Sequence, residues 1–463
     1  MTHNWNRLSL WLLAGLIILL IGAGFVFVIS SNLSQGVSEP APAVEQNEAV
    51  TVLPDSVEEQ PEPVTEPVEG ESVEVEPAEA EAAQVEVVEG EIQEEAVRRG
   101  PEILTVDDRP DRLRSLTSSW NTNWALHTID YQEILSGGPP RDGIPSIDSP
   151  TFVDQAAAAE WLVDNEPVIA LDIEGDARAY PLQVVTWHEI VNDTVGEVPV
   201  VVTFCPLCNS ALVFDRRFED QVFEFGVSGL LRNSDLIMYD RTTESLWQQF
   251  TGEGIVGDLT GEQLTFLPSS LISYADFRAA YPEGVVLSRD TGFNRSYGRN
   301  PYEGYDSIGS TPFLFRGPAD GRLEAVERVV TVSLNEAGVD VAYPLSILAE
   351  AGVINDSQGG QDLVVFHTDG TSSALGAGVI AEAEDVGATG VFDPNLNGQK
   401  LTFSKDGERI VDEETASTWN IVGQAVDGPL AGETLNSVVH GDHFWFSWAA
   451  FRPDTIIFGG DSE

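Results

Sequence analysis

The sequence is short of positive charge. Its 463 residues include 23 Lys and Arg against 76 Asp and Glu, a net charge of −53, and the only lysines are Lys400 and Lys405. Binding to a nucleic-acid backbone requires cations that displace its counterions. We therefore expect no nucleic-acid partner. The acidity is consistent with solubility, salt tolerance or attraction of cations, and does not choose among them.

Cysteine is almost absent. Cys205 and Cys208 are the only two, so a framework of several disulfides is excluded. They follow a valine-rich run, residues 198–202, that has the composition of a buried strand, and the motif Cys-Pro-Leu-Cys places them at the turn after it. Two thiols three positions apart at a strand end indicate chemistry more often than packing.

Several enzyme signatures are incomplete. No Gly-Lys-Ser follows the turn-rich segment 136–148, so it is not a phosphate-binding loop. His188-Glu189 begins like HExxH, but Asn192 stands where the second histidine is required. Segment 226–229 is one residue short of Gly-x-Ser-x-Gly, and a calcium-loop-like segment, 393–398, has Ser404 in place of the last glutamate. These four classes of site are therefore not expected.

The N-terminal residues predict a membrane anchor. Residues 10–29 are uncharged and apolar, and about twenty such residues span a bilayer as one helix. Arg7 precedes them and no basic residue follows until Arg98, so the positive-inside rule places residues 1–9 in the cytoplasm and the rest outside. The competing interpretation is a cleavable signal peptide. The membrane is the one partner expected; no protein partner is identified.

Residues 30–99 predict a spacer. The segment is rich in Glu, Pro, Val and Ala and has no basic residue before Arg98. Like charges repel and prolines prevent regular hydrogen-bond ladders, so we expect an extended, disordered acidic linker.

From residue 100 on, the sequence predicts a β-rich α+β fold with an internal duplication. Ala-Tyr-Pro-Leu occurs at 179–182 and 342–345, Asn-Asp at 192–193 and 355–356, and Ser-Ala-Leu at 210–212 and 373–375, all at one spacing. Matches at a fixed offset are the signature of a repeat. We predict two strand–helix–strand units, residues 100–315 and 316–463, joined by the Arg- and Tyr-rich segment 288–306.

Individual elements follow from local patterns. We expect strands at 167–171, 177–180, 211–214, 222–227 and 236–239, and helices at 152–162, 181–192 and 274–280.

The duplication also indicates where the chemistry lies. In the second copy Thr368 and Thr371 face the two cysteines, Ala351 faces His188, and Ile410 faces Met238. The surrounding sequence pattern is the same in both copies, whereas all of these reactive side chains are replaced in the second copy. A site confined to the first copy explains this difference.

Three hypotheses for the site remain open. Cys205 and Cys208 with His188 suit copper or zinc, and Met238 as a weak thioether ligand would favour copper, although a core position is the ordinary interpretation of both His188 and Met238. Alternatively the pair is a redox dithiol in which Cys205 attacks and Cys208 resolves. The third hypothesis is a binding or scaffold protein with a structural disulfide.

Two further groups are weaker candidates. His440 and His443 are spaced like a ligand pair on a turn and predict a possible second site, although histidines beside aromatics are more often structural. Arg289, Arg295 and Arg299 form the one cationic, aromatic-rich segment and predict anion binding; the plainer alternative is a linker paired with nearby carboxylates.

Long motifs resemble one family. SGGPPRDGIPSI, RAYPL, WHEIVND, TFCPLCNSA, FGVSGLLRNSDLIMYDRTTESLWQQ, LSRDTGFNRSYGRNPYEGYD and HFWFSWAAF, spread over residues 116–458, are similar to the bacterial and archaeal family labelled domain of unknown function 3179. The resemblance implies no activity. It implies only that the segments defining the family contain His188, Cys205, Cys208, Asp240, Arg241 and Trp247.

Overall fold

The computed structural model describes residues 102–218 and 220–460. All of these described residues fall within one structural unit. The expected membrane helix at 10–29 and the expected linker at 30–99 lie outside the described residues, so the expected membrane attachment and extracytoplasmic location stay predictions. Among the described residues no helix is both long and apolar enough to cross a membrane.

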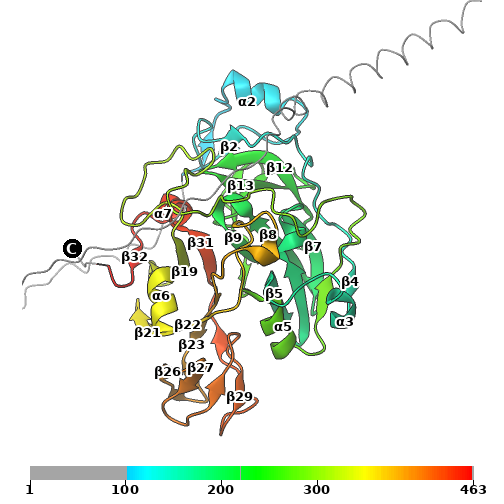
Figure 1. Ribbon diagram of the computed structural model, residues 1–463. Coiled ribbons are helices and arrows are strands. Elements are labelled where there is room, and N and C mark those ends of the chain that lie inside the picture. Colours follow the sequence, from blue (N-terminus) through cyan, green and yellow to red (C-terminus); the bar gives the residue numbers. More distant parts are fainter. Residues whose placement is uncertain (1–101, 219, 461–463) are drawn as a thin grey trace, which may run out of the picture. The chain divides into compact units, whose positions relative to one another are not determined.

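Small sheets, mostly antiparallel, build the fold, and the described residues are 39% strand and 11% helix in a β-propeller-like arrangement. Figure 1 shows these sheets and the short helices between them. The largest sheet has seven strands in the order β1-β2-β15-β14-β13-β12-β3. Their bounds are Leu104–Thr105, Leu126–His127, Glu253–Val256, Leu246–Gln248, Asp235–Asp240, Phe225–Arg232 and Leu135–Ser136.

The cysteines lie in a four-stranded sheet of order β16-β9-β8-β7, with bounds Phe266–Leu267, Ser210–Asp215, Val198–Cys205 and Ile190–Val195. A five-stranded sheet has the order β17-β5-β6-β18-β4, with bounds Ser270–Ser273, Pro167–Ile173, Asp176–Pro181, Val285–Leu287 and Phe152–Val153.

Three further four-stranded sheets follow. The first, β31-β19-β20-β32, spans Gly441–Phe444, Arg328–Leu334, Val339–Pro344 and Ile456–Ile457. The second, β21-β22-β23-β30, spans Val353–Gln358, Gln361–Thr368, Ala388–Asp393 and Asn436–Ser437. The third, β26-β27-β28-β29, spans Phe403–Asp406, Arg409–Asp412, Thr418–Trp419 and Ala425–Asp427. The hairpins β10-β11 and β24-β25 span Arg217–Phe218, Gln221–Val222, Asn395–Leu396 and Gln399–Lys400.

The helices are short. They are α2 (Asp111–Leu116), α3 (Gln155–Ala158), α4 (Leu182–Val185), α5 (Tyr274–Ala280), α6 (Leu345–Ala351), α7 (Trp445–Phe451) and the 3₁₀ turns η1 (Pro206–Cys208) and η2 (Ile380–Glu382). Helix α5 lies where the sequence predicts it, because the hydroxyl of Ser273 accepts a hydrogen bond from Asp276 N and caps it.

The predicted fold class, two strand–helix–strand units, is wrong. The expected helix 181–192 ends after Val185, and residues 190–195 form strand β7. The reason is local: Glu189 has a φ of +59°, which breaks the helix, and Ile190 and Val191 are β-branched residues that favour a strand. Between the strands the chain therefore makes one or two helical turns, and the described residues form hairpin-based sheets instead of two strand–helix–strand units.

Single contacts do recur. Trp247 Nε1 donates to Asp240 at 3.1 Å, and Trp419 Nε1 donates to Asp412 at 3.0 Å. Tyr180 donates to Asp193 at 2.6 Å, and Tyr343 donates to Asp356 at 3.0 Å. These polar contacts are therefore found in both predicted copies. They do not test the predicted boundary between residues 315 and 316.

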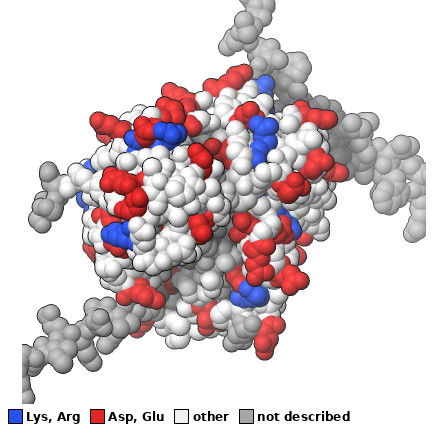
Figure 2. All heavy atoms as spheres, turned by 90° about the horizontal axis from the view of Figure 1, so that it is seen from below, with Lys and Arg blue, Asp and Glu red and all other residues white. Residues whose placement is uncertain are grey.

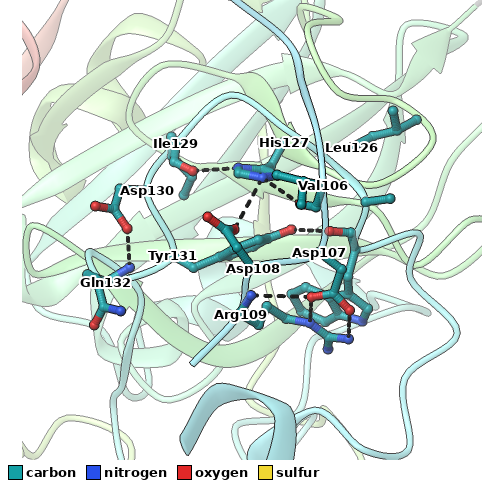
Figure 3. Close-up of polar contacts among 12 residues, drawn as sticks. Val106, Asp107, Asp108, Arg109, Leu126, His127, Ile129, Asp130, Tyr131 and Gln132 are labelled. Atoms are coloured by element: carbon teal, nitrogen blue, oxygen red, sulfur yellow. Dashed lines mark hydrogen bonds and ion pairs between the residues drawn. The ribbon is translucent and has the colours of Figure 1, made fainter. Parts of the chain in front are cut away.

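The N-terminal described segment is held to the large sheet by polar contacts. Figure 3 shows each ring nitrogen of His127 facing a carbonyl oxygen, Nδ1 at 2.7 Å from Ile129 and Nε2 at 3.0 Å from Val106. The hydroxyl of Tyr131 donates to Trp124 O at 2.6 Å. His127 is thus a buried histidine with protein partners on both sides.

The core is centred on the cysteine sheet. Its largest cluster of buried side chains includes both cysteines, Met238 and Trp247. Strand β31 packs against β9, so the C-terminal part of the chain lies beside the cysteine hairpin (Figure 1). On the surface, Figure 2 shows acidic side chains outnumbering basic ones on the face in view.

The two matching tyrosine contacts give a test. Asp193 is buried and also binds Arg178, whereas Asp356 is partly exposed and its lost bond can be replaced by water. We expect Tyr180→Phe to lower the free energy of unfolding by about 1.5–3 kcal/mol, the usual contribution of a hydrogen bond to a charged group. Tyr343→Phe is the matched control and should cost less than half as much. Urea unfolding followed by tryptophan fluorescence measures both, and an equal or larger loss for Tyr343→Phe contradicts the assignment.

Candidate metal centre

The cysteine pair occupies a tight turn between β8 and β9. Cys205 ends β8 and pairs with Ser210 of β9, Pro206 begins the 3₁₀ turn η1, and Asn209 has a φ of +50° that sends the chain back. Cys205 and Cys208 are 2% and 0% exposed. The motif therefore directs both thiols into the core.

A second hairpin brings Asp235 to the thiols. Asn233 and Ser234, between β12 and β13, both have positive φ, 52° and 67°, as in the two-residue turns that suit the twist of a hairpin. Asp235 is the first residue of β13 and is fully buried. Its Oδ2 accepts hydrogen bonds from Gln248 Nε2 at 2.6 Å and Phe250 N at 2.9 Å. Its Oδ1 is buried without a hydrogen-bond partner in the described structure.

The two turns meet. The sulfurs of Cys205 and Cys208 and a carboxylate oxygen of Asp235 all lie within 4.8 Å of one another. In a tetrahedral site with metal–sulfur bonds of about 2.3 Å, ligand atoms are about 3.5–3.8 Å apart, so a small contraction suffices. These three groups could hold a metal ion, and among the described residues they form the one such cluster of three.

Glu189 adds a second buried carboxylate. Its peptide carbonyl accepts a hydrogen bond from Phe204 N at 2.9 Å, which fixes it beside the strand that carries Cys205. Glu189 is 8% exposed as a residue, and its side chain forms no hydrogen bond or ion pair with any described residue. The carboxylate thus lies near the thiols without a counter-ion.

Burial makes all four groups weaker acids. It raises the pKa of Asp235 to about 7 and, with the charge of Asp235, that of Glu189 to about 8. Burial also raises the pKa of the Cys205 thiol, to which the charges of Asp235 and Glu189 add, and it raises the pKa of Cys208 further above its usual range. The cause in each case is loss of hydration of the charged form.

More polar atoms around the turn are buried without partners. They are Asn209 Oδ1, Ser210 Oγ and Gln249 Oε1. Buried polar atoms normally have a partner, so a group of such atoms near a donor cluster indicates a place where a further ligand is expected.

His188 does not belong to this cluster. It lies on the turn after α4 and is fully buried. Its Nδ1 donates to Pro145 O at 2.7 Å, and Nε2 then accepts from the hydroxyl of Tyr297 at 2.7 Å. Burial lowers the pKa of this imidazole, so the ring is neutral. Both nitrogens thus have protein partners, whereas the ligand hypothesis needs one of them free.

Met238 is a core residue of β13. It is fully buried and pairs with Val227 and Trp247 on the neighbouring strands. It shares the core cluster with the cysteines, and no described contact places its sulfur on them.

The three arginines have separate surroundings. Arg289 donates to Gln183 and lies over the ring of Trp161 at 4.7 Å, and the charge of Arg295 acts on His188. Arg299 is exposed and pairs through its backbone with Val379. The anion-binding prediction stays a prediction.

His440 and His443 are both buried at the start of β31. His440 Nδ1 is 2.8 Å from Val438 O, while His443 lies 4.4 Å from Phe250 and stacks on Trp448 at 5.8 Å, measured between ring centres. Neither belongs to a group of three possible ligands among the described residues. Burial lowers the pKa of His443 to about 3 and also lowers that of His440.

Sequence reasoning missed Asp235 and Glu189. The signal for Asp235 was the turn pair Asn-Ser before a strand, with an acid at the first strand position. Glu189 was not chosen as a candidate because the neighbouring His188 is the more common type of metal ligand.

Comparison with known proteins gives one match. A family model described as "Protein of unknown function (DUF3179)" matches residues 141–455, well over half of the chain. No curated protein and no solved structure matches the chain.

The buried ring of His443 predicts a pH dependence of stability. Above pH 6.5 the imidazole is neutral in both states. Below it the unfolded chain takes up a proton and the folded ring, with a pKa of about 3, does not, so stability falls between these values. His443→Phe removes this loss and should gain about 2–3 kcal/mol relative to the wild type on going from about pH 7.5 to 4.5. Urea titrations at both pH values measure the difference; a pH-independent difference contradicts a neutral buried ring.

Proposed function

The chain belongs to the DUF3179 family of proteins of unknown function, and we propose that it binds a transition metal ion through Cys205, Cys208 and Asp235. The observation that carries this proposal is the convergence of two sulfurs and a carboxylate oxygen within 4.8 Å. The buried, unpartnered Oδ1 of Asp235 supports it, because such an oxygen is costly unless something binds it.

The donor types favour zinc or copper over calcium or magnesium. Thiolates are soft ligands that select copper(I) and zinc, whereas calcium and magnesium require oxygen ligands. The carboxylate favours zinc, which accepts sulfur and oxygen together. Glu189 acts on this site through its charge, which influences the Cys205 thiol.

The charge balance supports the same proposal. Among the described residues neither Asp235 nor Glu189 forms an ion pair. A divalent cation would supply the missing positive charge to four buried acidic groups and would hold the thiols as thiolates. The protein groups would fix the ion and exclude water from it.

The redox alternative has less support. A reactive cysteine is usually partly exposed and has a lowered pKa. Cys205 is 2% exposed, its pKa is raised by burial, and it offers no approach to a large disulfide substrate. In a purely structural role for the pair, Asp235 interacts with the Cys205 thiol, but its Oδ1 gains no hydrogen bond of normal geometry.

Metal binding tests the proposal. Protein purified without chelator and titrated with Zn²⁺ against a competing chromophore should bind one equivalent. Cys205→Ser and Cys208→Ser each remove a ligand and should raise the Kd by at least about 100-fold, and Asp235→Asn by about 10–100-fold. Circular dichroism checks that each variant is folded, and Cys205→Ala replaces Cys205→Ser if it is not.

Two variants serve as controls. Asp215→Asn removes a buried carboxylate from the same hairpin, at the far end of β9, and should leave the Kd unchanged. His188→Gln should change it little, since its ring already has two partners. Unchanged zinc binding in Cys205→Ser and Cys208→Ser, both folded, overturns the proposal.

A further inference from the structure

An acidic pocket is lined by residues of α6 and of the segment 382–387. Its volume is about 660 Å³, within the range of ligand-binding cavities. Its lining includes Asp306, Glu327, Asp369, Glu382, Glu384 and Asp385, and among the described residues Arg328 and His367 are its only basic side chains. Its strongly negative charge suits a cation.

Two of these carboxylates are satisfied by the protein. Asp306 pairs with Arg328 at 3.1 Å, and Asp385 accepts hydrogen bonds from the backbone N–H groups of Gly370, Thr371 and Gly387. The side chains of Glu327, Asp369, Glu382 and Glu384 form no hydrogen bond or ion pair with any described residue. Their field therefore extends into the pocket.

A smaller cavity continues inward. Its volume is about 20 Å³, which holds roughly one water molecule or one bare ion. It shares Arg328, Leu345, Val386 and Gly387 with the outer pocket. Asn209, the residue directly after Cys208, is part of its wall. The two cavities thus lie in series between the surface and the cysteine turn.

Unpartnered polar atoms mark this path. Asn209 and Thr371, each 1% exposed, line the inner cavity, and Asn209 Oδ1 and Thr371 Oγ1 have no hydrogen-bond partner in the described structure. His367, 2% exposed, lines the outer pocket and has an unpartnered Nδ1. Buried oxygen and nitrogen acceptors of this kind suit a cation that sheds its water stepwise.

We propose that the acidic pocket collects a hydrated divalent metal cation and passes it through the inner cavity to the cysteine centre. This inference rests on the metal-binding function proposed above. A cleft lined by charge of one sign concentrates counter-ions and raises association rates. The ion in the pocket is the same ion that Cys205, Cys208 and Asp235 finally bind.

Asn209 closes the inner end of the path. Its Nδ2 donates to Asp442 O at 3.3 Å, a long and therefore weak hydrogen bond. The charge of Arg328 at the junction is balanced by Asp306. Asn209 joins the wall of the inner cavity to Cys208, the residue before it in the chain.

The loading rate of Co²⁺, followed by its thiolate charge-transfer absorbance in stopped flow, tests the route. The triple variant Asp369→Asn, Glu382→Gln, Glu384→Gln changes exposed, unpaired side chains and should fold. We expect its association rate to fall about 5–10-fold at low salt and to match the wild type at about 1 M salt, where charges are screened. The triple Glu160→Gln, Glu262→Gln, Glu283→Gln makes the same charge change away from the pocket and should have little effect.

A bulky substitution in the pocket distinguishes an effect on the entry route from an effect on metal affinity. Ala349→Trp places a large ring on the pocket wall, and it should slow loading and release by the same factor with the Kd unchanged, because an obstructed path does not alter the end states. Ala279→Trp on α5, exposed like Ala349, is the control. The proposed route is wrong if the wild type binds Co²⁺ and neither the triple variant nor Ala349→Trp slows Co²⁺ loading. It is also wrong if the two control variants slow loading as much as the pocket variants do. If the wild type gives no thiolate band, the metal function fails and the route with it.

Discussion

Acidic donors buried together in an apolar core are the constraint on which the rest of the structure depends. Two hairpin turns, one ending in Cys205 to Cys208 and the other leading into Asp235, meet within 4.8 Å, and Glu189 lies nearby. Each donor has lost its hydration, and burial raises the pKa of every one. Such an arrangement is stable only if the acids hold their protons or a cation replaces them. Only when a cation is bound do the two sulfurs act as ligands.

The remaining chain encloses this centre. Ser447, in α7 after β31, donates to Cys208 O at 3.5 Å, and Asn209 donates to Asp442 O at 3.3 Å. Tyr302 and Tyr305, in the segment between β18 and β19, pack against the same core cluster, and burial raises the pKa of both. The acidic pocket and the inner cavity beside Asn209 form the route that we propose for the ligand of this centre.

The position of the cysteine turn was easier to predict from the sequence than the architecture was. Two cysteines after a valine-rich strand were sufficient to locate the turn, and Ser273 before Tyr274 marked the start of α5. The helix predicted from Pro181 to Asn192 is not formed beyond its first turn, because Glu189 adopts a left-handed conformation. No local sequence pattern predicts that conformation. Asp235 could not be predicted as a partner, because its approach to the thiols depends on the packing of two hairpins from different sheets. His188, close to the thiols in sequence, instead binds Pro145 and Tyr297.

The most direct test of the central claim is X-ray absorption spectroscopy at the zinc edge on the folded, zinc-loaded chain. The account predicts two sulfur neighbours at about 2.3 Å and oxygen neighbours at about 2.0–2.2 Å, the distances expected for Cys205, Cys208 and Asp235. A shell made only of nitrogen and oxygen would contradict it.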